Sequence, residues 1–131
     1  MAKKNREPAH VLVGVCGASG LVYARRTLEI LHAAENVFVH MVTSPAARAV
    51  SDAESPAFPE WEKYAHRLHD PQDIHACVAS GSFPLRGMII APCSLHTAMS
   101  LAAGLAGDLI LRAGQVCLKE HRPLVLLLRE T

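Results

Sequence analysis

A strand, a glycine-rich turn and a helix near the N-terminus form the first pattern that can bind a ligand. The turn holds three glycines spaced by three residues, namely Gly14, Gly17 and Gly20. The apolar, β-branched run at 11–15 predicts a buried strand, and the apolar spacing over 21–32 predicts an amphipathic helix. Such a unit leaves backbone N–H groups unpaired where the helix begins, and the helix dipole favours negative charge there. The pattern fits phosphate or another anionic group, with the Ser19 hydroxyl beside it.

An ordinary tight turn between strand and helix explains the same residues. The dinucleotide fingerprint is G-x-G-x-x-G with an acidic residue at the end of the second strand. This chain has G-x-x-G-x-x-G and no such acidic residue. On this stretch alone, a plain βα turn therefore stays open beside phosphate or flavin binding.

Two more predicted strands are followed by hydroxyl side chains. The apolar run at 37–43 leads to Ser44, which we predict to cap a helix with Pro45 at its first position. That helix is predicted to end at about residue 52, with Glu54 just past it.

The second of these strands is predicted over 88–91 and ends at Pro92. Ser94 is predicted to cap the helix over 95–103, and Thr97 lies one turn into it.

The segments before and after this strand are less regular. A helical turn at 61–64, a weak strand at 65–68 and a long irregular loop over 69–83 are predicted, and the loop is a candidate lid or oligomer contact. Downstream, Asp108 is predicted to cap a helix that runs to about residue 120. The last strand is predicted over 123–128.

Strands that alternate with helices predict an α/β fold, a three-layer Rossmann or flavodoxin-like domain with a parallel sheet of about five strands. A ligand crevice is expected at the carboxyl ends of these strands. Four segments fall at that edge: Gly17 to Ser19, Ser44, Ser94 to Thr97, and Arg129 with Glu130.

Length and composition predict a single domain over residues 1–131, with a polar tail at 1–9. The formal net charge of +1 and the few aromatic residues argue against nucleic acid as a partner.

No segment approaches the roughly 20 apolar residues that span a bilayer, and the N-terminus lacks the pattern of a signal peptide, so we expect no membrane association and a cytoplasmic location. The cysteines and histidines show no zinc-binding spacing, and no metal site is expected.

The chain resembles the flavin prenyltransferases of the UbiX/Pad1 type, formerly called aromatic acid decarboxylases. The residues that carry the resemblance are Gly17-Ala-Ser-Gly20, Ser44-x-Ala-Ala-Arg48, Pro92-Cys-Ser94 with Thr97, and Leu118-Lys-Glu-x-Arg-Pro-Leu-Val125 followed by Arg129-Glu130. The resemblance implies a metal-independent enzyme that joins a dimethylallyl group from dimethylallyl monophosphate to N5 and C6 of reduced FMN. The product, prenylated FMN, would serve a UbiD-type decarboxylase. The resemblance also implies a homo-oligomer built from trimers, up to a dodecamer.

The same resemblance implies roles for individual residues. FMN would be held at the strand ends by Gly17, Ala18, Ser19, Ser44, Ser94, Leu95, His96, Thr97 and Arg129. The prenyl phosphate would lie among Arg112, Lys119, Arg129 and Glu130. The catalytic residues would be Ser19, Glu54, Lys119 and Glu130.

These residue types suit the chemistry. Fixed cations such as Lys119 stabilise the charge that develops on a departing phosphate. Glu130 would pass a proton to that phosphate, and Ser19 with Glu54 would relay protons at the flavin. The plainer alternative is that Arg112 and Lys119, spaced by seven residues, belong to a solvated helix face, and that Glu54 is an exposed loop residue.

Members of this family usually continue beyond the Arg-Glu pair through two helices and a Pro-rich segment that carries a tyrosine. We therefore expect this chain to lack the usual C-terminal segment and to leave an apolar face bare. Two alternative functions stay open. One is a non-catalytic FMN carrier subunit of a decarboxylase system. The other is a relative of the FMN-dependent cysteine decarboxylases, which carry an Asn in the loop that corresponds to Pro92 to Thr97, where this chain has none.

Overall fold

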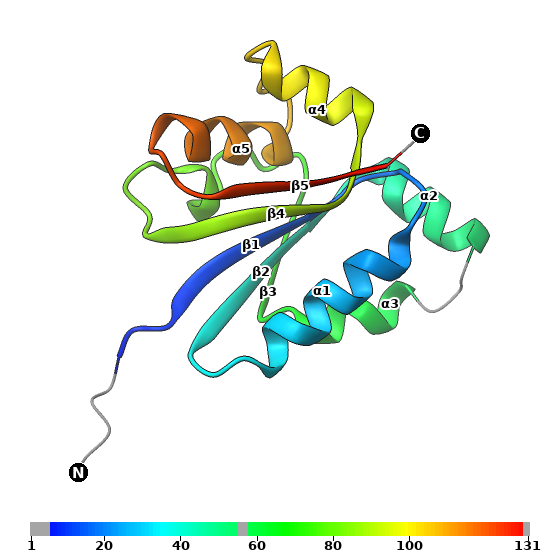
Figure 1. The fold of residues 1–131 in the computed structure, drawn as a ribbon, viewed down its shortest axis with the longest axis horizontal. Coiled ribbons are helices and arrows are strands. Elements are labelled where there is room, and N and C mark those ends of the chain that lie inside the picture. The colour runs from blue at the N-terminus through cyan, green and yellow to red at the C-terminus, as the bar shows by residue number, and fades with distance from the viewer. Residues whose placement is uncertain (1–5, 55–57, 130–131) are drawn as a thin grey trace.

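Five parallel strands form one sheet in the order β3–β2–β1–β4–β5 (Figure 1). The computed structural model describes residues 6–54 and 58–129. The strands are β1 (Ala9–Val15), β2 (Val37–Thr43), β3 (Arg67–His69), β4 (Leu85–Ser94) and β5 (Leu124–Arg129). The helices are α1 (Leu21–Ala33), α2 (Pro45–Glu54), α3 (Phe58–Trp61), α4 (Leu95–Ala102) and α5 (Leu109–Lys119), with 3₁₀ turns η1 (Glu62–Tyr64) and η2 (Cys77–Ala79). The predicted α/β fold is confirmed, and the strand order is of the Rossmann type.

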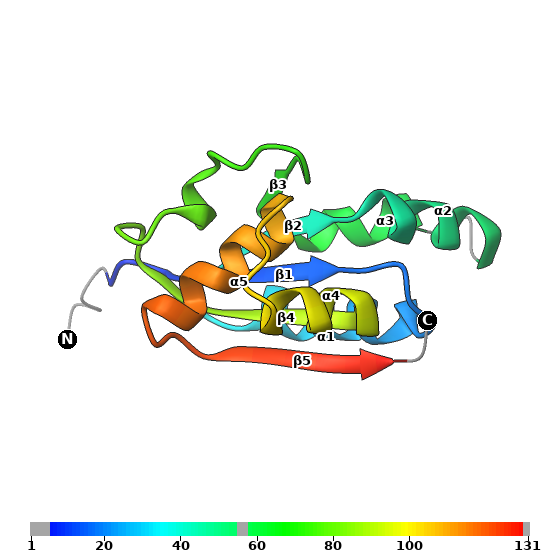
Figure 2. The same ribbon diagram turned by 90° about the horizontal axis from the view of Figure 1, so that it is seen from above.

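Alternate residues of the central strands point to two different apolar layers. On one face, Val13 of β1 and Met41 of β2 pack with Leu28 of α1. On the other face, Leu12 of β1 belongs to a cluster that includes Ile110 of α5. The view from above shows α4 and α5 on one side of the sheet and α1 on the other (Figure 2). Side chains that alternate along each strand therefore produce the three layers.

The predicted helix caps are present in the structure. The Ser44 Oγ accepts a hydrogen bond from the N–H of Ala47 at 3.0 Å. The Ser94 Oγ accepts from Thr97 at 3.1 Å, and Asp108 accepts from Leu111 at 2.8 Å. Each cap satisfies a backbone donor that the helix cannot satisfy itself.

Three predicted segments differ from the structure. The helix α2 continues to Glu54, so this residue ends a helix and does not follow one. The strand β4 begins at Leu85 and continues past Pro92 to Ser94, because Cys93 and Ser94 pair with Leu128 and Arg129 of β5. The register between the two strands shifts between Ile90 and Cys93, next to the residue that has no N–H to donate. The loop predicted over 69–83 contains the 3₁₀ turn η2.

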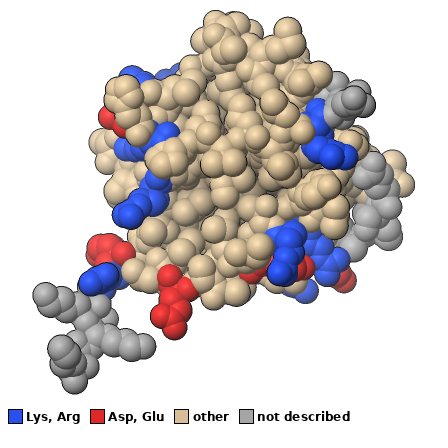
Figure 3. All heavy atoms as spheres, viewed as in Figure 1, with Lys and Arg blue, Asp and Glu red and all other residues tan. Residues whose placement is uncertain are grey.

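The edge strand β5 lies in front in Figure 1, and the same view in space-filling form shows a broad surface with charged side chains mainly around its margin (Figure 3). Several large apolar side chains of α4, β5 and the loop after α4 are exposed, namely Leu95, Met99, Leu105, Val125, Leu127 and Leu128. No helix within the described part of the chain is long and apolar enough to cross a membrane.

The glycine turn after β1 packs tightly against the first residues of α2. A Cβ at Gly17 would lie 2.6 Å from the Cβ of Ala46 and 2.8 Å from its carbonyl carbon. Backbone atoms cannot move aside as the end of a flexible side chain can, so this approach requires glycine.

We predict that Gly17→Ala lowers the free energy of unfolding by about 1–3 kcal/mol, because the added methyl group overpacks the contact with Ala46. Gly107→Ala is the matched control, since a Cβ there meets nothing within 4 Å. Urea denaturation followed by circular dichroism measures both. Equal stability of the two variants would contradict the tight contact.

Candidate functional site

The carboxyl ends of β1 and β4 lie side by side at the point where the strand order reverses. The chain leaves β1 toward β2 on one side, whereas β4 pairs with the other side of β1. In open parallel sheets, ligands bind in the crevice at this switch point. The N–H of Cys16 donates to the carbonyl of Pro92 at 3.2 Å and holds the two strand ends together.

Hydroxyl and thiol groups gather at this switch point. The Ser94 hydroxyl donates to the hydroxyl of Thr97 at 3.0 Å. The Cys16 Sγ lies 3.4 Å from the same Thr97 Oγ1. Since Cys16 and Ser94 are buried, these groups form a hydrogen-bonded polar cluster in a fixed position at the strand ends.

The two thiols near this polar cluster have opposite shifts in acidity. A hydrogen bond from the Cys93 thiol, helped by Thr97, lowers the pKa of Cys16 against the opposing effect of burial. The interaction with Cys16, followed by burial, raises the pKa of Cys93. Cys16 is therefore the more acidic of the two thiols, and Cys93 loses its proton only at higher pH.

The outer strand ends are joined to the same edge. The N–H of Ser44 donates to the carbonyl of Val15 at 2.9 Å, which places the start of α2 beside the glycine turn. On the other side, Arg129 pairs in register with Ser94. Its guanidinium carbon lies 5.3 Å from the centre of the Tyr23 ring on α1. These contacts bring four strand ends into one region.

The helix α1 begins without a side-chain cap. Its N-cap residue is Gly20, which has a φ of 98° and no side chain to accept a hydrogen bond. A Cβ at this glycine would lie 2.7 Å from the Tyr23 ring and 3.3 Å from the Arg129 Nε. The start of α1 therefore faces an arginine without a capping side chain, which suits an anionic ligand.

Most of the residues predicted to bind a ligand lie at this edge of the sheet. Ser19 is exposed in the turn after β1, and Leu95 and His96 are exposed in the first turn of α4. Gly17 and Ala18 precede Ser19 in that turn, whereas Glu130 lies outside the described residues. Cys16 is the member that sequence reasoning missed as a site residue, because the cysteines were considered only for zinc-binding spacing. Its position directly before the glycine turn was the available signal.

The two residues of α5 that were predicted to bind the prenyl phosphate, Arg112 and Lys119, lie away from this edge of the sheet. Lys119 is the last residue of α5, which leads into the start of β5, whereas Arg129 is the last residue of β5. Lys119 and Arg112 line an open pocket of about 240 Å³ together with Gly81. The Lys119 ammonium also lies 3.3 Å from the carboxylate of Glu120. One copy of the chain therefore does not bring Lys119 and Arg129 together.

Residues 1–129 match the family described as Flavoprotein. The flavin prenyltransferase UbiX of Salmonella typhimurium is 43% identical over 122 residues, which cover 92% of this chain and 65% of that protein. UbiX of Deinococcus radiodurans is 45% identical over 126 residues, covering 94% of this chain and 63% of that protein. The chain thus spans somewhat less than two thirds of the length of these relatives.

Solved structures show the same relationship. The crystal structure of AnUbiX (PadA1) in complex with FMN and dimethylallyl pyrophosphate superposes with a TM-score of 0.89 at 38% identity, over 95% of this chain and 66% of that one. A dodecameric FMN-dependent UbiX-like decarboxylase from Escherichia coli O157:H7 gives a TM-score of 0.88 at 38% identity, over 93% and 67%. The FMN-dependent cysteine decarboxylase SpaF, at 19% identity and a TM-score of 0.69 over 92% and 67%, shares the fold alone.

We predict that Cys16 forms a thiolate below the ordinary thiol pKa of 9.0. The thiolate is the charged form, so its amount rises with pH, and hydrogen-bond donors move that rise to lower pH. Thiolate absorbance in the ultraviolet, recorded against pH on the folded chain, measures this.

The early component is the part of the thiolate absorbance that appears below the ordinary thiol pKa. Cys16→Ser should remove this early component, and Thr97→Val should move it to higher pH. Cys117→Ser is the control, since burial raises the pKa of Cys117 and its loss leaves the early component in place. An early component that survives Cys16→Ser would refute the prediction.

Proposed function

This chain belongs to the Flavoprotein family, and from that membership we propose that it binds FMN at the carboxyl edge of its sheet as a flavin prenyltransferase. In this proposal the chain joins a dimethylallyl group from dimethylallyl monophosphate to N5 and C6 of reduced FMN. The observation that carries the proposal is the convergence of four strand ends at the switch point, tied by the contact of Cys16 with Pro92 and the pairing of Ser94 with Arg129.

The residues at this edge fit FMN. The uncapped start of α1 and the Ser19 hydroxyl offer donors to a phosphate, and Arg129 adds a positive charge beside them. Ser94 and Thr97 offer hydroxyl groups at the start of α4, where the edge of a flavin ring would meet them. In our proposal Gly17, Ala18, Ser44, Leu95 and His96 complete this site.

Bound reduced FMN would supply the nucleophilic N5 and C6 atoms. The chain's task is then to hold the allylic substrate and to assist the departure of its phosphate. Breaking the allylic C–O bond leaves positive charge on carbon and adds negative charge to the phosphate. Arg112, Lys119 and Arg129 would stabilise that phosphate in the transition state without a metal. Glu130 would donate a proton to it, and Ser19 with Glu54 would accept the proton that C6 loses.

Because Lys119 and Arg129 lie at opposite ends of β5, we infer that the α5 of a second copy supplies the cations to each site. A homo-oligomer built from trimers would allow this. The exposed apolar side chains of α4 and β5, among them Met99 and Leu128, support self-association. We further propose that prenylated FMN passes to a UbiD-type decarboxylase.

We predict that the purified chain binds FMN and converts reduced FMN with dimethylallyl monophosphate into a prenylated flavin. Fluorescence titration measures binding, and mass spectrometry of the extracted flavin measures the adduct. A chain that takes up no FMN would refute the proposed site. FMN binding without any adduct would refute the transferase and leave the non-catalytic carrier, which the separation of Lys119 from Arg129 within one copy favours.

Lys119→Ala should lower turnover by about a hundredfold or more, because it removes a charge needed only as the phosphate departs, and it should leave FMN affinity unchanged. Lys63→Ala is the control. Lys63 is also an exposed lysine, but it lies on η1 against Tyr64. Equal losses of turnover and FMN affinity in Lys119→Ala would argue against its role at the phosphate.

A further inference from the structure

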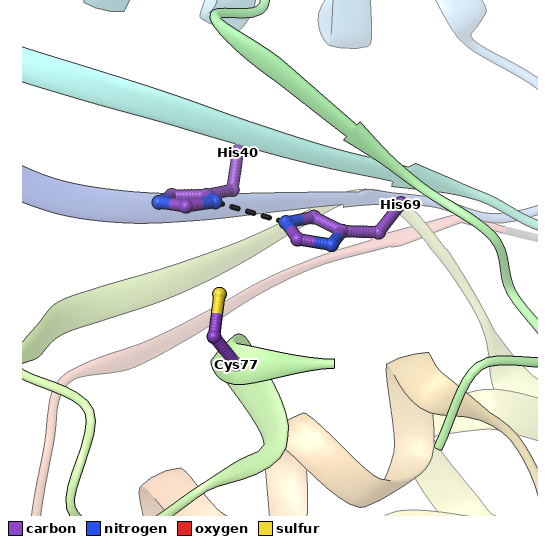
Figure 4. Close-up of side chains that lie close together, drawn as sticks. All are labelled: His40, His69 and Cys77. Carbon is purple, nitrogen blue, oxygen red and sulfur yellow. Dashed lines mark hydrogen bonds between the residues drawn. The ribbon is translucent and has the colours of Figure 1, made fainter. Parts of the chain in front are cut away.

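Two histidines and a cysteine meet on the sheet face that η2 covers. His40 comes from β2, His69 from β3 and Cys77 from η2. One ligand atom from each lies within 4.8 Å of the other two. Figure 4 shows the Cys77 thiol pointing toward the gap between the two imidazoles. Nothing in the flavin chemistry uses these three side chains.

The sheet register places the two imidazoles. His69 pairs with Val42, and His40 lies two residues earlier on β2, so the two rings share one face of neighbouring strands. The Nδ1 of His40 and the Nε2 of His69 are 2.9 Å apart. The His40 side chain is only 1% exposed, whereas His69 and Cys77 are half-buried. The cluster is therefore fixed on its inner side and reachable from outside.

We propose that His40, His69 and Cys77 form a binding site for one Zn²⁺ ion, with water as the fourth ligand. Imidazole and thiolate are the ligands that zinc prefers, whereas magnesium and calcium prefer oxygen. Zinc–nitrogen bonds of about 2.0–2.1 Å and zinc–sulfur bonds of about 2.3 Å place tetrahedral ligand atoms about 3.3–3.6 Å apart. The nitrogen pair must open slightly and the sulfur must move inward, which are side-chain rotations.

A second histidine is placed to orient the buried ligand. The Nε2 of His40 lies 2.8 Å from the Nδ1 of His10 on β1. When the His40 Nδ1 binds the metal, its Nε2 carries the ring proton, and this N–H donates a hydrogen bond to the Nδ1 of His10. Zinc-bound histidines usually donate their second N–H in this way, and the contact fixes the ring and its tautomer.

A cationic side chain lies next to the Cys77 thiol. An Arg67 guanidinium nitrogen lies 3.8 Å from the Cys77 Sγ and can donate a hydrogen bond to a metal-bound thiolate. The negative charge of Asp73 and the positive charge of Arg67 both act on His69, with opposite effects. Binding of Zn²⁺ forms one zinc–sulfur and two zinc–nitrogen bonds and releases the thiol proton of Cys77 to solvent. The imidazoles only exchange tautomers, so one proton is released for each ion bound.

The test is a titration of the tag-free chain, first stripped with a chelator, with Zn²⁺ and separately with Co²⁺. We expect one ion per chain, a thiolate-to-cobalt charge-transfer band, and a rise in the unfolding temperature with Zn²⁺, because only the folded chain assembles the ligands. Addition of Mg²⁺ at the same concentration should change none of these. Two or more ions per chain with equal affinity, or no binding, would overturn the proposal.

Variants of the partly exposed ligands separate this site from adventitious binding. Cys77→Ser should abolish the charge-transfer band, and His69→Gln should weaken Zn²⁺ affinity by more than about tenfold. His75→Gln is the matched control, because His75 is exposed, lies two residues from Cys77 and should leave affinity unchanged. Circular dichroism of each variant confirms that it folds. A cobalt–thiolate band that persists in folded Cys77→Ser would show that another cysteine binds the ion and would refute the site. Unchanged Zn²⁺ affinity in folded His69→Gln would show a purely hydrogen-bonded cluster and would refute it as well.

Discussion

The parallel pairing of β1 with β4 is the constraint on which the candidate site depends. These strands are far apart in the sequence, and their pairing puts the turn after β1 next to the start of α4. The helix that follows β1 packs on one face of the sheet, and the helix that follows β4 packs on the other (Figure 2). The two helix starts therefore diverge and leave between them the crevice in which open parallel sheets bind ligands. The contact of Ser44 with Val15 and the pairing of Arg129 with Ser94 add the ends of β2 and β5 to this arrangement.

Features that depend on local physics could be predicted from the sequence. Serine and aspartate are strongly preferred as caps before an apolar helical repeat, and Ser44, Ser94 and Asp108 all accept the expected hydrogen bonds. The alternation of strands and helices fixed the fold class and the edge at which the strand ends meet. The continuation of β4 past Pro92 could not be predicted, because it depends on pairing with β5. The end of α2 at Glu54 lies two residues beyond the predicted end. Local propensity is a weak guide to such ends.

Features that depend on which face an element presents were beyond the sequence. A spacing of seven residues correctly places Arg112 and Lys119 on one side of α5, but the packing of α5 on β4 and β5 decides where that side points. The cluster of His40, His69 and Cys77 was even less predictable from the sequence. His40 and His69 are 29 residues apart and belong to strands that pair only in the folded chain, so no spacing rule connects them. Zinc motifs recognised in sequences require ligands that are close along the chain.

The buried His40 in β2 is an energetically costly residue for this position in the sheet. Burying an imidazole costs free energy unless both nitrogens find partners. His40 has them in His10 and His69, and burial together with those neighbours lowers its pKa to about 4. An aliphatic side chain would fill the same space without this requirement, as Val42 does two residues later on the same face. A row of imidazoles across three neighbouring strands therefore needs a reason other than packing, and a nitrogen-binding cation supplies one.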